Sequence, residues 1–197
     1  GESNMCVSFS LQPQPVRLFL FACAFLELVS LACVLFGIGD SMRNFLIVMG
    51  GFWPDLLKGA RPIYTGQPVL MFATSAFLHG GPLHFLMNMF GLMWLGPMIV
   101  YRLGSNAFWL IAGLSNLGAG GLYAALSGPG GIPAIGASGV LFGFLGTVAL
   151  WEMLDQCLMD WCEGFDWYEM LIDMIHDRRE KGKERKKEFG TRSNEEN

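Results

Sequence analysis

The sequence predicts an all-α membrane protein, a four-span helical bundle followed by an amphipathic C-terminal helix. Hydrophobic residues make up 52% of the chain and charged residues only 15%, a more apolar balance than soluble domains have. The charges are also unevenly placed, because residues 62–101 and 103–151 contain no Lys, Arg, Asp or Glu. Long segments without charge are typical of helices that cross a bilayer.

Four apolar segments are long enough to cross a hydrocarbon layer of about 30 Å as helices. They cover residues 18–38, 83–101, 106–127 and 133–154. The membrane domain, residues 18–154, follows an N-terminal segment of residues 1–17. Its long connection, residues 39–67, contains Trp53 and several glycines, which predicts a structured loop at the membrane interface. A shorter apolar run at residues 68–78 is predicted to be re-entrant or interfacial.

The basic residues predict that both termini lie on the same, positively charged side of the membrane. If the spans alternate in direction, Arg17, Arg102 and the eight basic residues of the C-terminal tail share one side. Arg43, Lys58 and Arg61 fall on the other side, and Lys and Arg concentrate on the cytoplasmic side of membrane proteins. A bacterial inner membrane and an organellar inner membrane both fit this pattern.

Residues 155–177 are predicted to form an acidic amphipathic helix that docks on a partner. Acidic side chains recur every three to five residues and gather on one face, while apolar side chains gather on another. The segment is too charged to cross the membrane, since each central carboxylate costs about 2.5 to 3.5 kcal/mol on insertion scales. Asp160, Glu163 and Glu169 are the predicted partner-binding residues. Residues 178–197 are predicted to form a charged, solvated tail.

Composition also excludes some ligands. The net charge of −4 leaves no basic groove for nucleic acid. The five cysteines include no CxxC pair and no His at metal-ligand spacing, and no nucleotide or haem motif occurs. We therefore expect no metal and no cofactor. The expected partners are lipid and other integral membrane proteins, in a hetero-oligomeric complex.

The first group of residues that could take part in a reaction is Gly136-Ala137-Ser138-Gly139. It follows a Gly/Pro-rich turn and opens the fourth span. Glycines let the backbone approach a substrate carbonyl, and the free amides of a helix N-terminus can donate to a developing oxyanion. Ser138 is then a candidate nucleophile. The alternative is close helix packing, because Gly139 and Gly143 form a small-xxx-small pair.

His84 and Asn88 form the second group. They are four residues apart and share one helix face near the start of the second span. Polar side chains at membrane depth are costly unless they are buried and partnered, so both are functional-site candidates, with an interhelical clasp as the alternative. His79 is expected nearer the interface, within reach of water.

Together these motifs resemble the rhomboid family of intramembrane serine proteases. The resemblance covers roughly residues 50–150, where His84 and Asn88 match the family's HxxxN and Ser138 matches the nucleophile of its GxSG. It implies a rhomboid-like bundle in which Ser138 is the nucleophile. The implied oxyanion hole consists of His84, Asn88 and the Ser138 amide. Phe142, one turn later, is implied to be the aromatic residue of the substrate gorge.

The sequence departs from that family after the fourth span. The family completes its core with two further spans, the last of which holds the general base in an AHxxG context, and neither occurs in these 197 residues. A serine hydroxyl is a weak nucleophile without an adjacent base. His176 lies in the acidic segment, toward the membrane face opposite Ser138, so we do not expect it to act as the base.

We therefore predict a proteolytically inactive, rhomboid-like subunit of a membrane protein complex. The alternative is an intramembrane serine protease whose histidine comes from another chain or a longer form. Glu27, a lone carboxylate in the first span, is predicted to face the bundle interior. Ser30 is its candidate partner, and a structural hydrogen bond is favoured over a proton-relay role.

Overall fold

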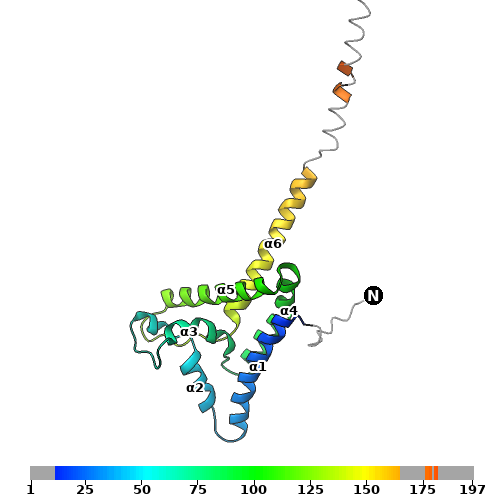
Figure 1. Ribbon diagram of the computed structural model, residues 1–197. Coiled ribbons are helices and arrows are strands. Elements are labelled where there is room, and N and C mark those ends of the chain that lie inside the picture. The colour runs from blue at the N-terminus through cyan, green and yellow to red at the C-terminus, as the bar shows by residue number, and fades with distance from the viewer. Residues whose placement is uncertain (1–11, 165–175, 179, 182–197) are drawn as a thin grey trace, which may run out of the picture. The chain divides into compact units, whose positions relative to one another are not determined.

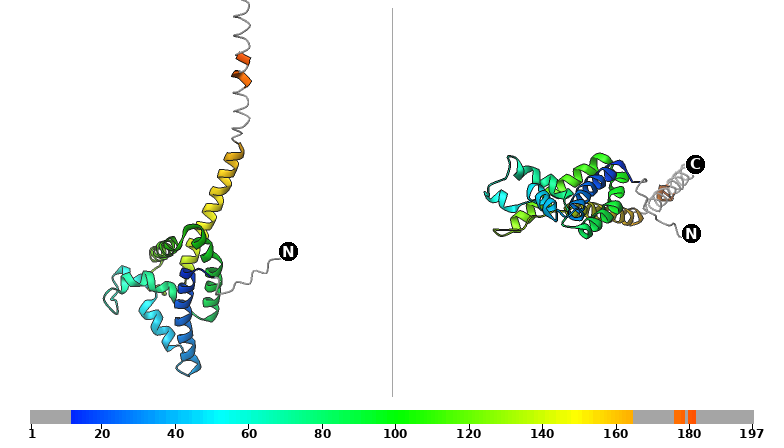
Figure 2. Two further views of the ribbon diagram at one scale, coloured as in Figure 1. Left: turned by 45° about the vertical axis from the view of Figure 1, so that its right-hand side comes forward. Right: turned by 90° about the horizontal axis from the view of Figure 1, so that it is seen from below.

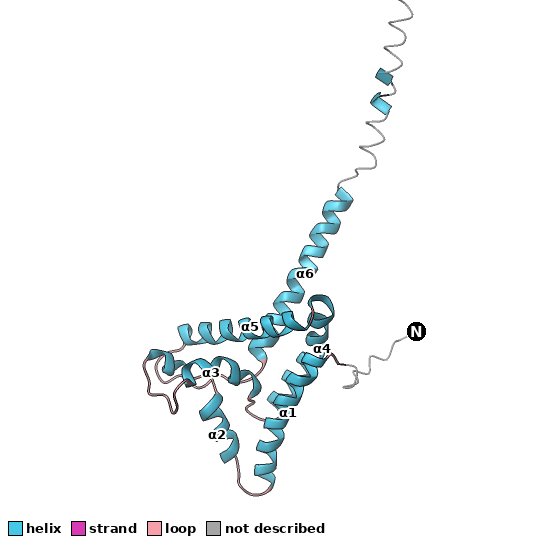
Figure 3. Cartoon of the chain, viewed as in Figure 1, coloured by secondary structure: helices cyan, strands magenta, loops and turns pink. Residues whose placement is uncertain are grey.

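The structure, a computed structural model, describes residues 12–164, 176–178 and 180–181, and this part of the chain is mostly helical (Figures 1 and 3). Its elements are α1 (Gln14–Leu35), α2 (Ser41–Gly50), η2 (Pro54–Lys58), α3 (Gln67–Thr74), η3 (Ser75–Phe77), α4 (Pro82–Leu103), α5 (Ser105–Leu126) and α6 (Ser138–Gly164), where η marks a 3-10 helix. The described residues form no strand, only an isolated antiparallel bridge between Phe52 and Ala134.

Four helices are long and apolar enough to cross a membrane, as predicted. They are α1, α4, α5 and the Ser138–Leu158 part of α6. With 22 residues each, α1, α4 and α5 are about 33 Å long at 1.5 Å per residue, which is enough to cross the hydrocarbon core. The predicted all-α membrane bundle is therefore confirmed. The side of the membrane on which the termini lie stays a prediction.

The chain divides into two compact units, and the boundary falls inside α6. The first unit ends at Leu150 and contains α1 to α5 with the start of α6. In the second unit, α6 continues to Gly164 without a break at residue 154, where the hydropathy pattern placed the end of the fourth span. Residues 176–178 are helical and exposed.

Little of the predicted docking helix can be compared with the structure. Asp160 and Glu163 lie in the final turns of α6, whose side chains are not described. Glu169 lies outside the described residues. The role of these three acids in partner binding stays a prediction.

Helices α1 and α4 pack side by side in the first unit (Figure 2). Gly96 permits the approach, because a Cβ added there would lie 2.8 Å from the Val16 Cγ2 atom. Membrane helices associate through such close contacts, since lipid tails provide no hydrophobic driving force. Phe19 extends the packed region, with its ring centroid 4.6 Å from that of Phe77 and 6.4 Å from that of Phe108.

The first turns of α6 pack against α5 through Gly139 and Gly143. A Cβ added to Gly139 would lie 3.0 Å from the Ala119 Cβ atom, and one added to Gly143 would overlap the Ser115 side chain. These contacts agree with the interpretation of the two glycines as a helix-packing pair. Close packing here fixes the start of α6, where Ser138 lies.

The connection between α1 and α4 is a structured loop that contains α2, η2, α3 and η3. Hydrogen bonds from side chains to backbone groups stabilise this loop. The Gln67 amide donates to the Val48 carbonyl (2.9 Å) and accepts from the Ile63 amide (2.8 Å). The Tyr64 hydroxyl donates to the Met49 carbonyl at 2.9 Å. The apolar run before α4 forms α3 and η3, and at eight residues α3 is too short to cross a bilayer.

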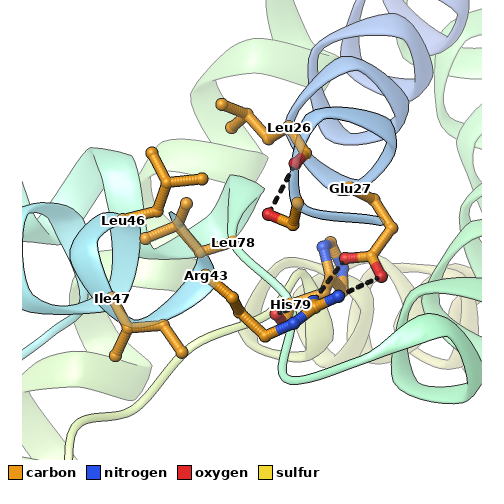
Figure 4. A pocket seen from close by; sticks show the side chains of 8 residues that line it. Leu26, Glu27, Arg43, Leu46, Ile47, Leu78 and His79 are labelled. Atoms are coloured by element: carbon orange, nitrogen blue, oxygen red, sulfur yellow. Dashed lines mark hydrogen bonds and ion pairs between the residues drawn. The ribbon is translucent and has the colours of Figure 1, made fainter. Parts of the chain in front are cut away.

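A buried ion pair joins α1 to this loop (Figure 4). Arg43 of α2 donates through Nη1 and Nη2 to the two Glu27 oxygens at 2.8 and 2.9 Å, and its Nη1 also donates to the His79 carbonyl at 2.9 Å. The hydrogen bond with Glu27 raises the pKa of the Arg43 guanidinium. Glu27 thus has a structural role, but its partner is Arg43. The Ser30 hydroxyl donates instead to the Leu26 carbonyl at 2.9 Å.

Removing one member of this pair should destabilise the fold strongly. Glu27→Gln leaves the guanidinium of Arg43, whose side chain is only 10% exposed, without a counter-charge. We expect the free energy of unfolding to fall by about 3–5 kcal/mol. Glu27→Leu combined with Arg43→Met should recover most of this loss, because an apolar pair can replace a buried ion pair. Equilibrium unfolding of the full chain in detergent micelles measures both effects.

Asp40→Asn is the matched control. The Asp40 carboxylate lies 3.9 Å from the Arg43 Nε atom, but its side chain is 71% exposed. We expect a change below about 1 kcal/mol, because exposed ion pairs contribute little. Equal effects of Glu27→Gln and Asp40→Asn would contradict the structural importance of the buried pair.

Candidate functional site

The turn before α6 brings Gly136 against both polar side chains of α4. Gly136 has a φ of +112°, and a Cβ added there would lie 2.8 Å from the His84 Cε1 and Nε2 atoms and 3.7 Å from the Asn88 Nδ2 atom. Asn88 is 4% exposed and His84 is half-buried. Their i, i+4 spacing places both on one face of α4. The glycine lets the turn approach this face, and any other residue would displace the ring.

The hydrogen bonds of His84 define which ring nitrogen carries its proton. The Gly80 amide donates to the Nδ1 atom at 3.3 Å, so Nδ1 is the acceptor of the neutral ring and Nε2 is the donor. Nε2 is the nitrogen next to Gly136. The Asn88 amide uses one N–H for the His84 carbonyl at 2.8 Å and keeps a second one. The hydrogen-bond donors of His84 and Asn88 therefore lie beside the turn at Gly136.

Ser138 is the first residue of α6, and it is exposed. Its hydroxyl makes no hydrogen bond with any of the described residues. The Leu141 amide donates to the Ala137 carbonyl at 2.9 Å, which is the first helical bond of α6. The helix amides that precede Leu141 have no intrahelical acceptor. Phe142, one turn after Ser138, is 74% exposed. Ser138 and Phe142 thus lie on one exposed face at the start of α6.

The connection between α1 and α4 holds the turn that leads to Ser138. Phe52 and Ala134 exchange two backbone hydrogen bonds of 2.9 Å, and the Gly136 amide donates to the Ser75 carbonyl at 2.9 Å. Two side chains of η2 add further bonds: Asp55 accepts from the Gly130 amide at 3.0 Å, and Lys58 donates to the Ser127 carbonyl. The position of Gly136 therefore depends on the loop.

Asn116 of α5 is a polar contact that sequence reasoning missed. It is 9% exposed, and its amide donates to the Phe72 carbonyl and, at 3.4 Å, to the Ser75 hydroxyl. A Cβ added to Gly139 would lie 3.1 Å from its Oδ1 atom. An amide side chain within a span without charges was the available signal, because such groups are usually buried and partnered.

His79 is buried within the fold. Its side chain is 4% exposed and so out of contact with bulk water, and its ring meets the His84 ring edge to face, with centroids 5.3 Å apart. Burial, followed by the neighbouring His84, lowers the pKa of His79 to about 4. His79 is therefore neutral at pH 7.

Among the described residues, no group of three or more His, Cys, Asp or Glu is placed to hold a metal ion.

The four spans and the donor cluster beside a helix-terminal serine define a multi-pass membrane protein of the helical-bundle class. The Rhomboid domain matches residues 67–174, more than half of the chain, and the chain belongs to the rhomboid family. RHOMBOID-like protein 1 of Arabidopsis thaliana is 33% identical over 102 residues, which are 52% of this chain and 24% of that relative. The chain thus spans about a quarter of the length of this relative.

The contact between Gly136 and His84 can be tested with Gly136→Ala. The added methyl group meets the His84 ring and forces an L-residue into a positive φ, which costs about 1–3 kcal/mol by itself. We expect a less stable chain whose His84 imidazole NMR signals shift. The readouts are equilibrium unfolding and ¹⁵N spectra of histidine-labelled chain in micelles.

Two glycine controls separate strain from contact. Gly130→Ala also faces a positive φ (+76°) but has open space around the new Cβ, so stability should fall without a shift of the His84 signals. Gly146→Ala, inside α6 and also in open space, should be neutral or stabilise by about 1 kcal/mol. If the His84 signals respond alike to Gly136→Ala and Gly130→Ala, the proposed contact is wrong.

Proposed function

We propose that these 197 residues act as a rhomboid-like membrane subunit that does not hydrolyse peptide bonds on its own. The hydrogen bond from the Gly80 amide to the His84 Nδ1 atom is the observation that carries this proposal. Its Nδ1 accepts the Gly80 amide hydrogen, so its Nε2 is protonated and can donate, but cannot take a proton from Ser138. The Ser138 hydroxyl itself has no imidazole partner among the described residues.

The other groups near Ser138 support an anion-stabilising role rather than a proton-accepting one. The free amides at the start of α6, the Nε2–H of His84 and the spare N–H of Asn88 are all donors. Such donors stabilise an oxyanion once it forms. They do not deprotonate a serine hydroxyl, which therefore stays a weak nucleophile.

A fluorophosphonate probe tests this directly. The purified full chain should show no labelling above that of Ser138→Ala, since the probe reports a serine activated by a base. A catalytically active serine hydrolase in the same detergent is the positive control. Labelling of the purified chain that disappears in Ser138→Ala would overturn the proposal.

The second candidate is an intramembrane serine protease that receives its histidine from a further helix. The exposure of Ser138 and of Phe142 favours it, because this face of α6 is open to another helix. The same probe distinguishes the two functions when it is applied to native membranes before extraction. Labelling of Ser138 in membranes but not after purification would favour the protease.

The exposed apolar surface supports an interaction role in either case. Large side chains of α4 and α6 are exposed, among them Phe90 (71%), Trp94 (59%) and Phe142 (74%). In a membrane such faces contact lipid or neighbouring helices. The sequence of residues 155–177 adds a run of acidic side chains. We therefore propose other integral membrane proteins as partners, with the acidic segment facing a basic patch.

Charge reversal tests the acidic segment. Asp160→Lys, Glu163→Lys and Glu169→Lys together should weaken co-purification with the partner proteins, and the loss should depend on salt because charge pairing is screened. Glu184→Lys, Glu188→Lys and Glu195→Lys carry the same charge change outside the segment and serve as the control. Identical co-purification by the two triple variants at low salt would rule out docking through the segment.

A further inference from the structure

The imidazole of His79 is buried without a hydrogen-bond partner. Its side chain is 4% exposed, and neither Nδ1 nor Nε2 bonds to any of the described residues. Burial lowers the pKa of His79 and a contact with the Phe77 backbone opposes this shift, but the contact falls short of hydrogen-bond geometry at either ring nitrogen. A neutral ring has one N–H donor and one acceptor nitrogen. Buried groups of this kind are nearly always bonded to protein or to ordered water.

A small cavity has His79 among its lining residues (Figure 4). Its volume is about 10 Å³, and its polar lining consists of Glu27, Ser30, Arg43 and His79. A cavity of this size holds about one water molecule, provided that the water finds two to four polar partners. The side chains of Leu26 and Leu46 contribute to the apolar remainder of the wall, so the site has no room for a larger ligand.

The polar groups of the wall keep unused hydrogen-bonding capacity. Each Glu27 oxygen accepts one bond from Arg43, and a carboxylate can accept about four. The Ser30 hydroxyl donates its hydrogen to the Leu26 carbonyl and keeps lone pairs as acceptors. A water molecule here can accept the His79 N–H and donate to Glu27 and Ser30. Each hydrogen bond of the water then uses a donor or acceptor that has no protein partner.

A cation fits this cavity less well than water. The single carboxylate already pairs with Arg43, whose own positive charge would repel a second cation. An anion would meet the Glu27 carboxylate. A neutral molecule that both donates and accepts suits the lining, and the volume restricts the choice to water.

We propose that the cavity between α1, α2 and the residues before α4 is a built site for one water molecule, held by His79, Glu27 and Ser30. The bound water completes the polar contacts that begin with the Glu27–Arg43 pair. It also fixes the His79 ring, which contacts the His84 ring. His79 is thus a positioning residue for the start of α4. The site is distinct from Ser138 and does not depend on whether the chain is a protease.

Imidazole NMR of the full chain, ¹⁵N-labelled at histidine and held in micelles, tests the water site. At pH 7 we expect one neutral tautomer of His79 whose N–H shows a nuclear Overhauser effect to long-lived water. His176, which is exposed, provides the reference for fast exchange, and His79→Gln assigns the signal. A His79 N–H that couples directly to a protein carbonyl, without a water signal, would overturn the proposal.

Two Ser30 variants distinguish bound water from exchange through the Ser30 hydroxyl. In Ser30→Ala the water loses one acceptor but keeps His79 and Glu27, the minimum of two polar partners for a buried water, so its signal at His79 should persist. In Ser30→Val the larger side chain fills the cavity, so the signal should disappear. Loss of the signal in Ser30→Ala, or its persistence in a folded Ser30→Val chain, would each contradict the water site.

Thr147→Val is the matched control for these variants. Thr147 also donates its hydroxyl to the carbonyl four residues earlier, that of Gly143, at 2.8 Å, but it does not line the cavity. The water signal at His79 should be unchanged in this variant. A loss equal to that of Ser30→Val would show that the signal reports general loosening of the bundle rather than a specific water.

Discussion

The arrangement of the first unit depends on the buried ion pair between Glu27 and Arg43. Within hydrocarbon no water is available to solvate a carboxylate, so Glu27 in the first span requires an internal partner. Arg43 supplies it from α2 and uses a further N–H for the His79 carbonyl. Three parts of the chain, the first span, the interfacial loop and the residues before α4, thereby meet at one guanidinium.

The candidate site is built from the backbone as much as from side chains. The Gly80 amide determines which nitrogen of His84 is protonated, and the absence of a side chain at Gly136 lets the turn reach the ring. The start of α6 contributes amides that no helical carbonyl uses. The missing side chain at Gly136 therefore lets the donors of α4 and the first amides of α6 lie close together.

Sequence alone predicts those features that lipid imposes directly. The four spans follow from length and hydropathy, and the common face of His84 and Asn88 follows from the helical repeat. The partner of Glu27 was not predictable in this way. Ser30 lies one turn away, but Arg43 reaches Glu27 only because the chain reverses between α1 and α2. The burial of His79 also depends on tertiary neighbours. The spacing of apolar and acidic residues predicted a helix from residue 155, but not that it would continue α6 without a break, since helical hydrogen bonding does not end where apolar residues do.

The turn from residue 127 to residue 137 has little regular structure of its own. Tyr123 of α5 donates to the Ile132 carbonyl of this turn, and the connection between α1 and α4 contributes the bonds from Phe52, Asp55, Lys58 and Ser75. This connection is therefore coupled to the turn that carries Gly136. A displacement of the connection would pass through these bonds to Gly136 and change its distance from the His84 ring, even if the spans themselves did not move.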